Sequence, residues 1–109
     1  MPNNNYIALL VTRDRAIGFD ATSSRFIETQ LPLHDELLAA EAERYVAVVI
    51  TSSRAFGLAA ETPAFTEINL RLSETIEAIK LTYSKVTVRT SDRLLTFETS
   101  GLPWKELRF

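Results

Sequence analysis

Three arginines recur at equal spacing, and they are the side chains of this chain best suited to bind an anion. They are Arg15, Arg54 and Arg93, placed 39 residues apart. A guanidinium recognises a carboxylate or phosphate through parallel hydrogen bonds. Three arginines brought together at one side of the protein would therefore form a site for an anionic ligand. Glutamates recur at the same interval, at Glu28, Glu67 and Glu106. We expect each arginine to pair with a carboxylate of its own copy, because residues held in every copy serve the unit they share.

Aromatic residues follow the same interval. They are Phe26, Phe65 and Trp104. An aromatic ring can stack on a sugar, but one at the same point of each unit is more commonly core packing. Trp104 departs from the two phenylalanines, so we add it to Arg15, Arg54 and Arg93 as a candidate binding residue.

Residues suited to catalysis are few. His34 is the only histidine, and it has no counterpart at 39-residue steps. The chain has no cysteine and three glycines, which excludes thiolate ligands, disulfides and a glycine-rich phosphate loop. No metal-ligand spacing is present. We therefore expect no enzyme, no cofactor and no metal. The alternative is a hydrolase in which the repeated units surround a central channel, and carboxylates or His34 line that channel as the active site.

A repeat accounts for these intervals. The stretch 12–19 matches 51–58 and 90–97, and the apolar run 7–11 matches 46–50. The matches hold over two periods without gaps, so we interpret 1–109 as a single repeat domain. Its copies span about 6–44, 45–83 and 84–109, and the third copy is incomplete.

Each copy divides into short apolar segments separated by polar, Gly or Pro breaks. In the first copy we expect strands over 6–12, 16–21 and 25–31, with the first buried on both faces. Thr12, Thr51 and Thr90 are expected to close the hairpin turns that follow. The fourth segment, over 35–42 and 75–81, is ambiguous. Its Glu, Ala and Leu favour a helix, whereas four strands fit the repeat length better, and we favour the strand.

Four short antiparallel strands every 40 or so residues resemble a β-propeller blade. The resemblance concerns architecture, because the WD dipeptide and the kelch double glycine are absent. It implies an all-β fold, half of a six-bladed β-propeller, that lacks one outer blade strand. Three blades cannot close a ring, so we expect a head-to-tail homodimer. A β-trefoil is the alternative, although a trefoil needs twelve strands and this sequence predicts eleven.

The balance of charge limits the partners. With 12 basic and 14 acidic residues, the chain lacks the basic excess typical of nucleic-acid binding. Its apolar runs are too short to span a membrane, so we expect a cytoplasmic protein. The leading hypothesis is a non-catalytic binding or interaction protein that assembles by oligomerisation, with a protein or a carbohydrate as its ligand. A lectin-like carbohydrate binder is a variant, and a fragment of a longer repeat protein is a further possibility.

Overall fold

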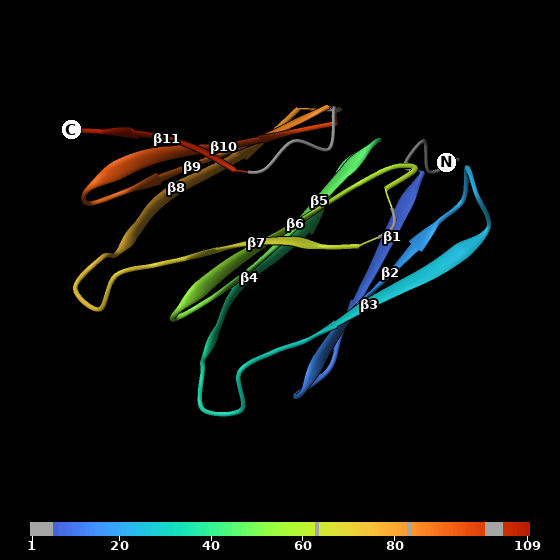
Figure 1. Ribbon diagram of the computed structural model, residues 1–109, viewed down its shortest axis with the longest axis horizontal. Helices are drawn as coiled ribbons and strands as arrows, with labels where there is room; N and C mark the ends of the chain where they lie inside the picture. Colours follow the sequence, from blue (N-terminus) through green and yellow to red (C-terminus); the bar gives the residue numbers. More distant parts are fainter. Residues whose placement is uncertain (1–5, 63, 83, 100–103) are drawn as a thin grey trace.

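The computed structural model describes residues 6–62, 64–82, 84–99 and 104–109. Eleven antiparallel strands form three separate sheets, which follow one another along the chain (Figure 1). Sheet 1 holds β1 (Ile7–Val11), β2 (Arg15–Asp20) and β3 (Arg25–Gln30). Sheet 2 holds β4 (Leu37–Ala42), β5 (Val46–Thr51), β6 (Arg54–Ala59) and β7 (Thr66–Asn69). Sheet 3 holds β8 (Ile76–Leu81), β9 (Lys85–Thr90), β10 (Arg93–Glu98) and β11 (Lys105–Arg108).

The ambiguous fourth segment of each copy is a strand, as predicted. β4 pairs with β5 and β8 pairs with β9, both antiparallel. Tertiary pairing overrides the helical preference of Glu, Ala and Leu, which is weak in so short a segment. The expected breaks at Pro63 and at 101–103, and the segment 1–5, lie outside the described residues.

The incomplete sheet is the first, not the third. Each fourth segment joins the next strand through three residues, 43–45 or 82–84, and so forms a hairpin with the copy that follows it. Sheet 3 therefore has four strands and sheet 1 has three. Neighbouring sheets approach each other most closely at one side, where β1 lies near β4 and β5, and β5 lies near β9. The missing strand belongs to this converging side, which corrects the expectation that an outer strand is lost.

The core lies in two seams between neighbouring sheets. Alternate residues of the central strands β5 and β6 point to opposite sides, so sheet 2 contributes to both seams. Val48 and Ala55 pack against sheet 3, while Val49 and Phe56 pack against sheet 1. Every residue of β5 is buried, as predicted for a strand covered on both faces. β1 is only partly buried, because within the described ranges no sheet covers its other face.

Two glycines allow the sheets to approach each other. A Cβ on Gly57 would lie 2.8 Å from the ring of Phe97 in sheet 3. A Cβ on Gly18, the equivalent residue of sheet 1, would overlap the side chain of Leu58 in sheet 2. A residue without a side chain at this point of β2 and β6 therefore allows the neighbouring sheets to pack this closely.

Candidate functional site

The three hairpin turns share one hydrogen-bonding pattern. The hydroxyl of Thr51 donates to the Arg54 carbonyl (3.3 Å) and accepts from the Arg54 N–H (3.2 Å). Thr90 makes both bonds with Arg93 at 3.1 and 3.0 Å, and Thr12 donates to the Arg15 carbonyl at 3.3 Å. The predicted turn-closing role of these threonines is thus confirmed.

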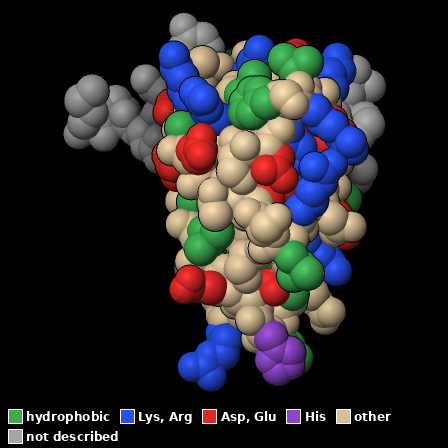
Figure 2. Space-filling view, turned by 90° about the vertical axis from the view of Figure 1, so that its left-hand side faces the viewer, with side chains coloured by type: hydrophobic (Ala, Val, Ile, Leu, Met, Phe, Trp, Pro, Cys, Tyr) green, Lys and Arg blue, Asp and Glu red, His purple; other side chains and the backbone are tan. Residues whose placement is uncertain are grey.

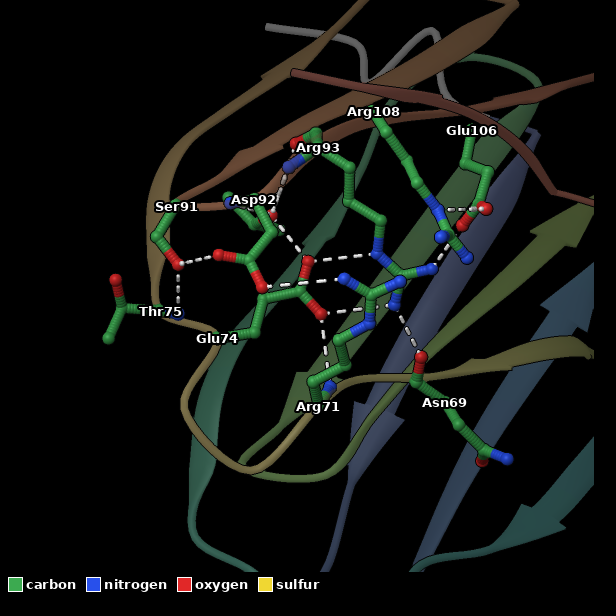
Figure 3. A network of polar contacts seen from close by, with 10 residues as sticks. Asn69, Arg71, Glu74, Thr75, Ser91, Asp92, Arg93, Glu106 and Arg108 are labelled. Carbon is green, nitrogen blue, oxygen red and sulfur yellow. Dashed lines mark hydrogen bonds and ion pairs between the residues drawn. The ribbon is translucent and has the colours of Figure 1, made fainter.

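In sheet 3 the turn carries a buried cluster of charges (Figure 3). The Arg93 guanidinium donates to the Glu74 carboxylate from Nε (2.8 Å) and Nη2 (3.0 Å). It also pairs with Glu106 and donates to the Asn69 carbonyl at 2.6 Å. The side chains of Arg93 and Glu74 are 6% and 0% exposed. Four hydrogen bonds of the Arg93 guanidinium are directed within the protein, and its burial leaves it unavailable to a ligand.

Glu74 is held in its charged form. Burial by itself would raise the pKa of its carboxyl, but hydrogen bonds from Arg93 and Thr90 outweigh burial and lower the pKa to about 2. The N–H of Arg71 adds a further bond at 3.0 Å. The sequence interpretation missed Glu74, although a signal was available. The 39-residue offset places it in step with Asp35, and both lie two residues before a strand.

Sheet 2 has a smaller version of this cluster. The carboxylate of Asp35 accepts from the Thr51 hydroxyl (2.7 Å) and from the Ser53 N–H (3.2 Å) and hydroxyl. The hydrogen bond from the Ser53 hydroxyl is the main reason that the pKa of Asp35 is lowered. Arg54 is left to Glu67, with 3.2 Å between Nη1 and Oε2.

Among the described residues, sheet 1 has this turn without an equivalent of Asp35 or Glu74, and the Thr12 hydroxyl instead donates to Asp14 at 3.1 Å. Arg15 lies 3.6 Å from Asp14 and 3.7 Å from Glu28, and its side chain is 46% exposed. The predicted pairing of each arginine with the glutamate of its own copy is therefore confirmed in all three sheets, with very different burial. Figure 2 shows the side of the molecule that faces left in Figure 1, where Lys and Arg side chains gather beside Asp and Glu.

Trp104 is a core residue, which corrects its place among the candidate binding residues. It is 8% exposed, its ring lies 5.3 Å from that of Phe97, and its indole N–H donates to the Thr66 carbonyl at 2.9 Å. Its equivalent Phe26 is 76% exposed on sheet 1. The difference arises because sheet 3 packs against a preceding sheet, whereas no sheet precedes sheet 1 among the described residues.

Catalytic groups do not converge in the described residues. His34 is exposed in the link between β3 and β4, and in Figure 2 the histidine lies at the lower edge beside one basic side chain, away from the larger group of Lys and Arg side chains. Residues 6–62, 64–82, 84–99 and 104–109 contain no group of three or more His, Asp or Glu arranged to hold a metal ion. In the same ranges no helix is long and apolar enough to cross a bilayer.

The two end faces of the row of sheets differ in chemistry. The outer face of sheet 1, turned away from sheet 2, carries Ala8, Leu10, Ile17, Phe19 and Phe26. Leu10 is 60% exposed, and the rings of Phe19 and Phe26 lie 4.9 Å apart. The equivalent residues of later sheets pack on a preceding sheet. They are Ala47, Val49, Phe56, Leu58 and Phe65 in sheet 2, and Val86, Val88, Leu95, Phe97 and Trp104 in sheet 3.

The outer face of sheet 3 is mixed in character. It carries Thr87, Arg89, Leu94, Thr96 and Leu107. Arg89 pairs with Glu77 at 3.6 Å. Thr96 stands where the two seams have glycine, so a further sheet could not approach this face as closely. Sheet 1 thus ends in an apolar face, whereas sheet 3 ends in a face suited to water.

Comparison with known proteins addresses the fold. No protein-family model matches the chain, and no curated protein matches it. The crystal structure of the N-terminal domain of Nup159, a β-propeller, is similar at a TM-score of 0.52 and 12% identity, over 98% of this chain and 32% of that one. The fold is propeller-like and all-β.

A second solved structure agrees with this. It is the extracellular domain of the putative one component system BT4673 from B. thetaiotaomicron, with a TM-score of 0.52 and 9% identity, over 99% of this chain and 16% of that one. The chain thus spans about a third of the first neighbour and about a sixth of the second. At such identities the likeness concerns the fold alone.

Proposed function

We propose that this chain is a non-catalytic interaction module that associates with a second copy through the outer face of sheet 1. The observation that carries the proposal is the exposure of Leu10 and Phe26 at positions whose equivalents pack against a neighbouring sheet in both seams. Large apolar side chains gathered on one sheet face are typical of a protein interface. Burying them against a like face would stabilise a pair through the hydrophobic effect.

The arrangement of the two copies follows from the other end of the row. A head-to-tail ring of six blades needs sheet 3 to receive the partner's sheet 1. There the partner's Phe19 would meet Thr96, whereas its equivalents Leu58 and Phe97 meet glycines. We therefore propose that the two copies pair sheet 1 to sheet 1, with the same surface on both sides of a two-fold axis.

Other functional hypotheses have less support. A lectin-like site built on Trp104 would need that ring at the surface, and it is buried. A hydrolase built on His34 would need a nearby carboxylate or nucleophile, and His34 is exposed in a link. Arg15 and Arg54 remain half-exposed and could contact an acidic partner.

Light scattering coupled to size-exclusion chromatography tests the proposal. We expect the wild-type chain to have the mass of a dimer and Phe26→Lys to have the mass of a monomer. The matched control, Leu94→Lys on the outer face of sheet 3, should remain a dimer. A monomeric wild type at high micromolar concentration would overturn self-association. Loss of the dimer in Leu94→Lys would instead support the head-to-tail ring.

A further inference from the structure

In the part of the chain that the structure describes, sheet 1 has no counterpart of β4 and β8, the first strands of sheets 2 and 3, and those two strands dock in one register. Leu37 is opposite Thr51 and Ile76 is opposite Thr90, and each pairing continues after an irregularity of one residue. The repeat therefore defines how a strand beside β1 would lie. Its first residue would be opposite Thr12, the equivalent of Thr51 and Thr90.

The edge of β1 is positioned to receive such a strand. Among the described residues, β2 is the only strand hydrogen-bonded to β1. Thr12 N–H donates to the Arg15 carbonyl of the β2 side, so the backbone groups of the odd-numbered residues Leu9 and Val11 face away from β2. A groove of about 430 Å³ lies there, lined by Ile7, Ala8, Leu9 and Val11 of β1 and by Ala40, Glu41 and Ala42 of β4.

Charge at the end of this edge indicates what the strand should carry. In sheet 3 a carboxylate two residues before β8 neutralises Arg93 at 2.8 Å. In sheet 2 a carboxylate two residues before β4 accepts from Thr51. Sheet 1 offers the same threonine and arginine, Thr12 and Arg15. Both are exposed. The Thr12 hydroxyl donates to Asp14 at 3.1 Å, and Arg15 lies 3.6 Å from Asp14 and 3.7 Å from Glu28, so a donated carboxylate would replace these exposed local contacts.

We propose that the edge of β1 is an acceptor site for an extended segment donated by a partner protein. The segment has a carboxylate, one intervening residue and then a six-residue strand with apolar side chains, as in 35–42 and 74–81. Its backbone adds a strand to sheet 1, and its carboxylate binds Thr12 and Arg15. Backbone pairing supplies affinity and the carboxylate fixes the register. This proposal does not depend on self-association, because the backbone edge of β1 is not part of the outer face of sheet 1, and Arg15 lies only at the rim of that face.

The test uses a labelled synthetic peptide with the sequence of residues 72–82 and measures its fluorescence polarisation against the full chain. We expect saturable binding, weakened roughly tenfold or more when the peptide carries Glu74→Gln, since a charged hydrogen bond is lost. Arg15→Gln in the protein should weaken binding similarly. The matched control Arg54→Gln should not, because the edge of sheet 2 is already occupied by β4.

Two further results decide the proposal. The peptide should bind Phe26→Lys as well as wild type, and on binding it should slow amide exchange at Leu9 and Val11. The proposal is overturned by no binding, by equal binding of the Glu74→Gln peptide, or by equal losses in Arg15→Gln and Arg54→Gln. Circular dichroism of each variant establishes that the comparison is made between folded proteins.

Discussion

Arg15 and Arg93 occupy equivalent positions in the first and last sheets, yet their surroundings differ. Arg93 is buried with two glutamates and a backbone carbonyl, whereas Arg15 is half-exposed beside looser carboxylates. The added partners of Arg93 come from residues 69–74, which lie before sheet 3 in the chain. A repeated residue thus acquires its role from the sheet that precedes it. Sheet 1 has no preceding sheet among the described residues, and its arginine remains available.

Removing the acid from the buried cluster should have the largest effect on stability. Glu74→Ala leaves the guanidinium of Arg93 buried with fewer partners, and such a loss costs about 3 to 5 kcal/mol. The matched change in sheet 1, Glu28→Ala, should cost less than about 1 kcal/mol because that pair is exposed. Urea unfolding monitored by circular dichroism measures both free energies. Equal losses would mean that the two clusters do not differ as described.

Acid should weaken the cluster of sheet 3. The pKa of Glu74 is about 2 in the folded protein and 4.5 without the fold, so its contribution is complete above pH 4.5. That contribution disappears as the pH falls from 4.5 towards 2. Each unit of pKa is worth about 1.4 kcal/mol, which gives about 3 kcal/mol in total.

The comparison of wild type with Glu74→Gln across this pH range isolates the glutamate. Asp20, Asp35 and Glu106 also have lowered pKa values and protonate in both proteins. The difference in unfolding free energy between the two proteins should therefore shrink as the pH falls. A constant difference would show that Glu74 is not the acid-sensitive group.

Substitution of the glycine in a seam should destabilise the protein more than substitution of the equivalent residue on the outer face of sheet 3. Gly57→Ala places a methyl group against Phe97 and should cost about 1 to 3 kcal/mol through overpacking. Thr96→Ala, on the outer face of sheet 3, should change the unfolding free energy by less than about 1 kcal/mol. Thermal unfolding of the two variants provides the comparison. A similar cost at both sites would indicate that sheet 3 receives a further sheet after all.

The arginine of sheet 1 should matter least for folding. Arg15→Gln removes exposed ion pairs with Asp14 and Glu28, which are worth less than about 1 kcal/mol. Its urea midpoint should stay close to that of wild type. A large loss of stability would give Arg15 a structural role like that of Arg93 and would count against the proposal that Arg15 binds a partner.

The sequence predicted the strands well because spacing alone carries that information. Equal offsets predicted the pairing of each arginine with its own glutamate and the turn-closing bonds of Thr12, Thr51 and Thr90. A period has no intrinsic starting point, however, so it could not show that 35–42 pairs with the copy that follows. The burial of Trp104 and the exposure of Phe26 depend on which sheets have a neighbour. That property belongs to the arrangement of the sheets rather than to any residue type.

Amide hydrogen exchange tests the central claim that sheet 1 has an open edge where the other sheets have a strand. The relevant amides are those of Leu9 and Val11, compared with their equivalents Val48, Ile50, Thr87 and Arg89, which face β4 or β8. We predict low protection factors at Leu9 and Val11 and high ones at the other four. Equal protection at all six positions in the isolated chain would contradict the account.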